Sequence, residues 1–180
     1  MASRLAGPGS PRRPHKGMRV SSGDIDERIS LLEDEIQQGK RDPNVRKIAG
    51  QVLKKVPSRD WKAEAIALFE YTRKVIRYTR DPAGVELFQS PARALDHGIG
   101  DCDDQVIFLG SLLQCVGYPI MLRVIGLRGS DSFQHIYIMV GLPPHDPAEY
   151  MPLDPSRPEP AGWELPESQR GLLQDYIVED

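Results

Sequence analysis

The residue whose position most suggests chemistry is Cys102, which lies in the run Gly98-Ile99-Gly100-Asp101-Cys102-Asp103-Asp104-Gln105 before a long apolar segment. Asp101 is of a type that commonly caps helices, so the pattern predicts a helix that begins at this cysteine. The unpaired backbone N–H groups and the positive dipole end at such a helix start stabilise a thiolate and can bind an oxyanion. Cys102 is therefore a candidate nucleophile.

A cysteine nucleophile needs a base within hydrogen-bond reach and a third group that orients the base. His135 lies in a predicted strand, and Asp154 lies at the end of the next one. Neighbouring antiparallel strands are about 4.8 Å apart, so two side chains on one face can meet. The chain order predicts Cys102 as nucleophile, His135 as base and Asp154 as orienting group.

Three aspartates surround the candidate thiol, and negative neighbours disfavour a thiolate. Asp101 can be satisfied as a helix cap, while Asp103 and Asp104 point about 100° and 200° away from Cys102 at helical spacing. The sequence alone leaves open whether Cys102 is a reactive thiolate.

The elements that must position these residues follow from the hydrophobic periodicity. The helix after Asp101 is apolar on nearly every face, which predicts a buried helix at the centre of the domain. Pro152 predicts an edge or a bulge for the last strand. We expect helices at about residues 24–39, 43–55, 59–77, 91–97 and 101–116, and strands at 120–127, 133–140 and 149–154. This order indicates an α+β fold, with the central helix packed on an antiparallel sheet and extra N-terminal helices.

The pattern also divides the chain. Residues 1–22 are predicted to be a flexible basic arm, 23–57 N-terminal helices, 58–157 the core, and 158–180 a Pro-rich acidic tail. The first 20 residues hold five basic groups and no acid. We expect a basic arm of this kind to contact a partner subunit.

Composition excludes several classes. The 180 residues carry a formal net charge of −3, which makes nucleic acid an unlikely partner. No apolar run is long enough for a membrane span or a signal peptide, so we expect a cytoplasmic protein that does not bind membranes. Cys102 and Cys115 lie about 20 Å apart on one predicted helix, too far for a disulfide. A metal site built from Cys102, Asp103, His135 and Asp154 lacks zinc-type spacing, so no metal and no cofactor are expected.

Five stretches of the sequence, taken in chain order, form a pattern that extends beyond the three candidate site residues. They are Ile76-Arg77-Tyr78, Gly100 to Gln105, Gly117-Tyr118-Pro119, the strand with His135, and Pro152-Leu153-Asp154-Pro155-Ser156. Together they resemble the transglutaminase-like core, a papain-like fold with a Cys-His-Asp triad, over roughly residues 65–157. The segment Asp81-Pro82-Ala83-Gly84-Val85-Glu86-Leu87 resembles the short form encoded in bacteriophage and prophage structural-gene clusters.

The resemblance implies the roles already assigned to Cys102, His135 and Asp154. The oxyanion tryptophan of the eukaryotic enzymes has no counterpart here, so Gln89 or the backbone N–H of Cys102 is the expected oxyanion donor. The implied activity is that of a cysteine hydrolase or acyltransferase on a protein or peptide substrate. A protease or amidase is favoured over a transamidase. The alternative is that the protein is a structural phage virion or assembly component that uses the same fold with a dormant or single-use triad. Its N-terminal arm would then contact the phage structural assembly.

Overall fold

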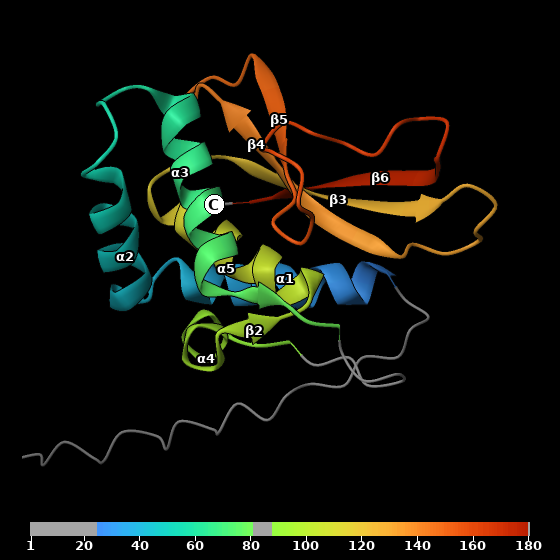
Figure 1. Cartoon of the computed structure of the whole chain (residues 1–180), viewed down its shortest axis with the longest axis horizontal. Coiled ribbons are helices and arrows are strands. Elements are labelled where there is room, and N and C mark those ends of the chain that lie inside the picture. The colour runs from blue at the N-terminus through green and yellow to red at the C-terminus, as the bar shows by residue number, and fades with distance from the viewer. Residues whose placement is uncertain (1–24, 81–87, 180) are drawn as a thin grey trace, which may run out of the picture.

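The computed structural model describes residues 25–80 and 88–179 (Figure 1). The predicted basic arm and the segment Asp81–Leu87 lie outside this part of the chain.

Three helices form the N-terminal part: α1 (Ile25–Gly39), α2 (Pro43–Leu53) and α3 (Trp61–Val75). Aspartates cap the N-termini of α2 and α3. The side chain of Asp42 accepts from the Asn44 N–H at 2.7 Å, and that of Asp60 accepts from the Ala63 N–H at 3.0 Å. Each cap satisfies a backbone donor that the first turn leaves unpaired. The helices begin and end within two residues of the predicted positions.

The central helix is α5 (Cys102–Cys115), with twelve consecutive buried residues from Asp103 to Gln114. It packs against α1, α2 and α3 on one side and against β4 on the other (Figure 1). The predicted buried central helix and the α+β fold are confirmed.

The sheet is antiparallel, with the strand order β5-β4-β3-β6. Its strands are β3 (Ile120–Leu127), β4 (His135–Leu142), β5 (Glu149–Leu153) and β6 (Arg170–Val178). Ile125 pairs with His135, the first residue of β4. Because β5 lies at the edge, Pro152 needs no ladder hydrogen bond on its outer side, which confirms the edge position predicted for it.

Strand β6 lies within the segment predicted to be a Pro-rich tail. It pairs with β3 almost along its whole length, from Val178 opposite Ile120 to Arg170 opposite Leu127. Most of its residues are exposed, so its sequence lacks the alternation that marks a half-buried strand. No strand was predicted here for that reason.

A small parallel pair joins β1 (Arg77–Tyr78) to β2 (Ile99–Gly100), and α4 (Pro91–His97) lies between them in the chain. Gly98 ends α4 in the left-handed region, with φ 64°, which glycine adopts without strain. Tyr78 lies opposite Gly100, two residues before Cys102. This pairing, which the sequence did not predict, holds the segment that leads into α5.

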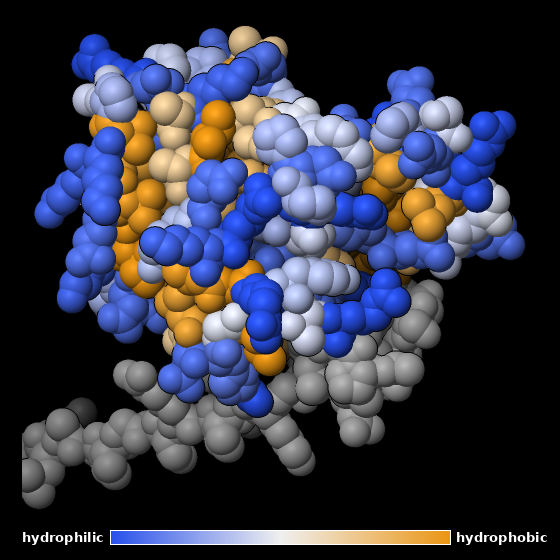
Figure 2. Space-filling model, in the orientation of Figure 1, coloured by the Kyte–Doolittle hydropathy of each residue, from blue (hydrophilic) through white to orange (hydrophobic). Residues whose placement is uncertain are grey.

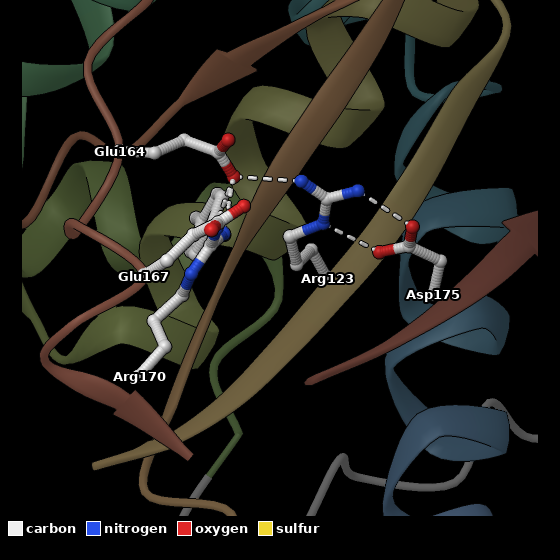
Figure 3. A network of polar contacts seen from close by, with 6 residues as sticks. Arg123, Glu164, Glu167, Arg170 and Asp175 are labelled. Atoms are coloured by element: carbon white, nitrogen blue, oxygen red, sulfur yellow. Dashed lines mark hydrogen bonds and ion pairs between the residues drawn. The ribbon is translucent and has the colours of Figure 1, made fainter. Parts of the chain in front are cut away.

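The face of the sheet turned away from α5 carries a second cluster of buried apolar residues: Ile125, Tyr137, Met139 and Leu165. A polar network lies over it (Figure 3). Arg123 binds Asp175 of β6 through two hydrogen bonds of 2.6 Å, and Glu164 accepts from both Arg123 and Tyr137. These contacts hold the segment that follows Asp154 against the sheet.

The side of the molecule in Figure 2 is mostly hydrophilic. Hydrophobic surface lies between α2 and α3 and, at the right of the view, where β3 ends and β6 begins. Within residues 25–80 and 88–179, no helix combines the length and apolar character needed to cross a membrane.

Candidate active site

Cys102 is the first residue of α5, and Asp101 caps the helix as predicted. The carboxylate of Asp101 accepts from the backbone N–H groups of Asp103 at 2.9 Å and Asp104 at 3.2 Å. In return, the side chain of Asp104 accepts from the Asp101 N–H at 3.2 Å, which completes a capping box. This reciprocal pair fixes where the helix begins, and with it the position of the thiol.

His135 and Asp154 lie in direct contact. Nε2 of His135 is 2.6 Å from Oδ2 of Asp154, and the Asp154 residue is only 8% exposed. Its other oxygen accepts from the hydroxyl of Ser156 at 2.7 Å and from the Ser156 N–H at 3.2 Å. A carboxylate held this way favours the tautomer that carries its proton on Nε2 and leaves Nδ1 as the basic nitrogen.

The thiol lies beside the same stretch of β4. The backbone N–H of Ile136, the residue after His135, donates to the sulfur of Cys102 and lowers the thiol pKa. Cys102 thus meets the second residue of β4, and Asp154 contacts the first.

The electrostatic surroundings of Cys102 favour the neutral thiol. Burial raises the pKa of Cys102 well above its ordinary value, and the charges of Asp103 and Asp101 raise it further. Arg28 and the Ile136 N–H act in the opposite direction without reversing the shift. In the resting protein the thiol is therefore protonated at neutral pH.

The two aspartates after Cys102 point into the protein. Asp103 forms an ion pair with Arg28 of α1, and Asp104 accepts from the backbone N–H of Gln89 at 2.8 Å. Burial, reinforced by the charge of Asp101, raises the pKa of each to about 7, although Arg28 and Gln89 oppose the two shifts. Near neutral pH the negative charge of both is therefore reduced, which weakens the effect of Asp103 on the thiol.

Gln89 lies in a different arrangement from the one its predicted role requires. Its amide nitrogen donates to Asp104 at 2.7 Å and to the Ile99 carbonyl at 3.1 Å, and its amide oxygen meets Nδ1 of His97 at 2.8 Å. These contacts engage both amide N–H groups, so Gln89 braces α4 and β2 against α5. The other expected oxyanion donor is the backbone N–H of Cys102, which has no acceptor within its own helix because it is a first-turn residue.

Sequence reasoning missed Arg28, Ser156 and Arg157. One signal for Arg28 was available, because it interrupts the apolar stripe of α1 three residues after Ile25 and four before Leu32. Ser156 and Arg157 follow Asp154 directly. Among the residues the structure describes, no group of three or more His, Cys, Asp or Glu side chains could hold a metal ion.

No protein-family model and no curated protein matches the sequence. Solved structures match the fold, which is papain-like with the α+β arrangement of a transglutaminase core.

Among the particular matches is LapG from Legionella pneumophila. Its calcium-bound structure is 15% identical, with a TM-score of 0.54, over 83% of this chain and 87% of LapG. The EGTA-treated form is 17% identical, with a TM-score of 0.52, over 84% and 86% of the two chains.

A structure from Parabacteroides distasonis ATCC 8503, described as a candidate protease, is 11% identical, with a TM-score of 0.55. That match covers 73% of this chain but only 26% of the other, so this chain spans about a quarter of that protein's length. At these identities the matches establish the shared fold alone.

Proposed function

We propose that this protein is a transglutaminase-like cysteine hydrolase that cleaves a peptide or carboxamide bond with Cys102, His135 and Asp154. The observation that carries the proposal is the 2.6 Å contact between Asp154 and Nε2 of His135, which is next in the chain to Ile136, whose N–H meets the Cys102 sulfur. The likeness of the fold to the candidate protease from Parabacteroides distasonis supports the same class of activity.

The reaction begins from the neutral thiol. Nδ1 of His135 takes the thiol proton as the sulfur attacks the carbonyl carbon, and Asp154 stabilises the imidazolium that forms. The Cys102 N–H and the positive end of α5 stabilise the negative oxygen of the tetrahedral intermediate.

The intermediate collapses when the C–N bond breaks and His135 gives its proton to the leaving amine. Water then attacks the thioester with His135 as base, which releases the acid and restores the thiol. An amine could take the place of water and give a transamidase. Hydrolysis is favoured because water is always present.

One LapG structure is calcium-bound, but the carboxylates beside Cys102 in this chain already have other partners. Arg28 already neutralises Asp103, and Gln89 and the Asp101 N–H occupy Asp104. Within the described residues, Asp103 Oδ1 is a buried oxygen of this group without a hydrogen-bond partner, but calcium takes six to eight oxygen ligands. These residues do not fit calcium, and no step of the proposed reaction uses it.

The test is hydrolysis of a mixed peptide library, with new termini detected by mass spectrometry. We expect cleavage by the wild-type protein and by Cys115→Ala, the matched cysteine control, and no cleavage by Cys102→Ala. His135→Ala should lower the rate about 10²–10⁴-fold. Equal cleavage by Cys102→Ala, or an intact library after incubation with the wild-type protein, would reject the proposal.

A second candidate is an assembly component of the phage type, in which the triad is dormant or acts once on a neighbouring subunit. The raised pKa of the Cys102 thiol favours it, because a neutral thiol is a poor nucleophile. An intact peptide library together with assembly that Cys102→Ala leaves unchanged would support this alternative.

A further inference from the structure

A cavity of about 470 Å³ opens beside His135. Its lining includes Tyr78 and Arg80, at and just after β1, and Ser156 and Arg157, which follow Asp154. His135, the proposed base, lines the cavity, and Tyr78 pairs with Gly100 in the segment that leads into Cys102. A peptide whose carbonyl reaches the thiol would place a neighbouring group here.

The lining of this cavity is positively charged. Arg80 and Arg157 are its two permanently charged members, and no carboxylate is among the lining residues that the structure describes. The chain as a whole has a net charge of −3, so this local excess of positive charge is a property of the cavity.

The donors of Arg157 are not used up by its nearest acid. Its Nε lies 4.0 Å from Oδ2 of Asp154, which is longer than a hydrogen bond, and its side chain is 40% exposed. A guanidinium presents five N–H donors in a planar fork that matches a carboxylate. Gln134 uses its amide oxygen to accept from Leu127 at 3.1 Å, which leaves its amide N–H groups as further donors toward the cavity.

We propose that this cavity binds a carboxylate of the peptide substrate, close to the bond that is cleaved. Arg80 and Arg157 bind the carboxylate, and Gln134 adds a neutral donor. The inference rests on the proposed function for its position relative to the scissile bond. The carboxylate belongs either to an acidic side chain or to the free end of the chain, and the experiment below separates the two sources.

The test uses the full chain carrying Cys102→Ala, so that binding is measured without turnover. The probes are three pools of hexapeptides with neutral random flanks, presented together in equilibrium dialysis and counted by mass spectrometry. One pool has a central glutamate and an amidated end, the second a central glutamine and an amidated end, and the third a central glutamine and a free carboxyl end.

We expect one of the two carboxylate pools to be retained at least about fivefold more than the neutral pool. Preference for the first pool identifies an acidic side chain, and preference for the third identifies a terminal carboxylate. Arg157→Gln and Arg80→Gln should each reduce the preference, whereas Arg41→Gln, the same change in the exposed turn between α1 and α2, should leave it intact.

Equal retention of the three pools, or a preference that survives both cavity substitutions, would overturn the inference. Because the protein used cannot turn over, this outcome is independent of the hydrolysis assay. Wild-type cleavage without carboxylate preference would reject only the cavity assignment. Carboxylate binding without any wild-type cleavage would reject only the proposed function.

Discussion

Arg28 of α1 forms an ion pair with Asp103 of α5, 75 positions later in the chain and directly after Cys102. The pair joins the first described helix to the start of the helix that carries the thiol. It also places a cation and an anion beside the sulfur, and the two charges act on the thiol pKa in opposite directions.

Substitution of this pair should therefore change the reactivity of Cys102 in two directions. Asp103→Asn removes a charge that raises the thiol pKa, so alkylation by iodoacetamide at neutral pH should become about threefold to tenfold faster. Arg28→Gln removes a charge that lowers the pKa and should slow the same reaction. Peptide mapping by mass spectrometry measures both rates, with Cys115 as the internal control. A change of the same sign in both variants would contradict this account.

The stability of the protein should fall as pH rises from about 4 to about 7. In the folded chain burial raises the pKa of Asp104 from 3.8 to about 7, so the folded state binds a proton that the unfolded state has already released in this range. Each such group gives a slope of up to about 1.4 kcal/mol per pH unit. Urea unfolding across this range measures the slope.

Asp104→Asn should flatten that pH dependence, because the amide keeps its place in the capping box but does not titrate. Asp96→Asn, at an exposed aspartate of α4, provides the matched control. An unchanged slope in Asp104→Asn would show that this carboxyl group titrates normally in the folded protein.

Gln89→Ala distinguishes a bracing role from an oxyanion role. The side chain donates to Asp104 and to Ile99, so its loss should destabilise the fold by about 1–3 kcal/mol. Turnover should change only severalfold, whereas loss of an oxyanion donor costs about 10²–10³-fold in kcat. Thermal unfolding and the peptide assay, run on the same preparation, separate the two outcomes.

Arg123 should be the most important charged residue of the outer sheet face. It is 15% exposed at the side chain and binds Asp175 and Glu164 at once (Figure 3). Arg123→Ala leaves both carboxylates without their main partner, and we expect a loss of about 2–4 kcal/mol. Arg41→Ala is the exposed control, and urea unfolding is the measurement. Equal stability of the two variants would mean that the network contributes little.

Much of the scaffold could be predicted from the sequence because its signals are local. The apolar run after Asp101 and the cap itself define α5, and β3 was predicted with both ends correct. The contact between His135 and Asp154 follows from two strands that neighbour each other in chain and in space.

The remainder depends on contacts between distant segments. Strand β6 is recognisable only through its pairing with β3, and β1 and β2 are too short to carry a periodic signal. The partners of Asp103 and Asp104 come from α1 and from the segment before α4. Helical spacing alone predicts that these two aspartates point away from the thiol. It could not show that they would be buried and paired.

The most direct test of the triad is acylation of Cys102 by a p-nitrophenyl ester of an acetylated amino acid, followed by acid quench and peptide mass spectrometry. We expect an adduct on Cys102 that forms much faster than any adduct on Cys115. His135→Ala should slow it about 10²-fold or more, and Asp154→Asn should also slow it. Acylation of the two cysteines at equal rates, or a Cys102 rate that His135→Ala leaves unchanged, would contradict the proposed triad.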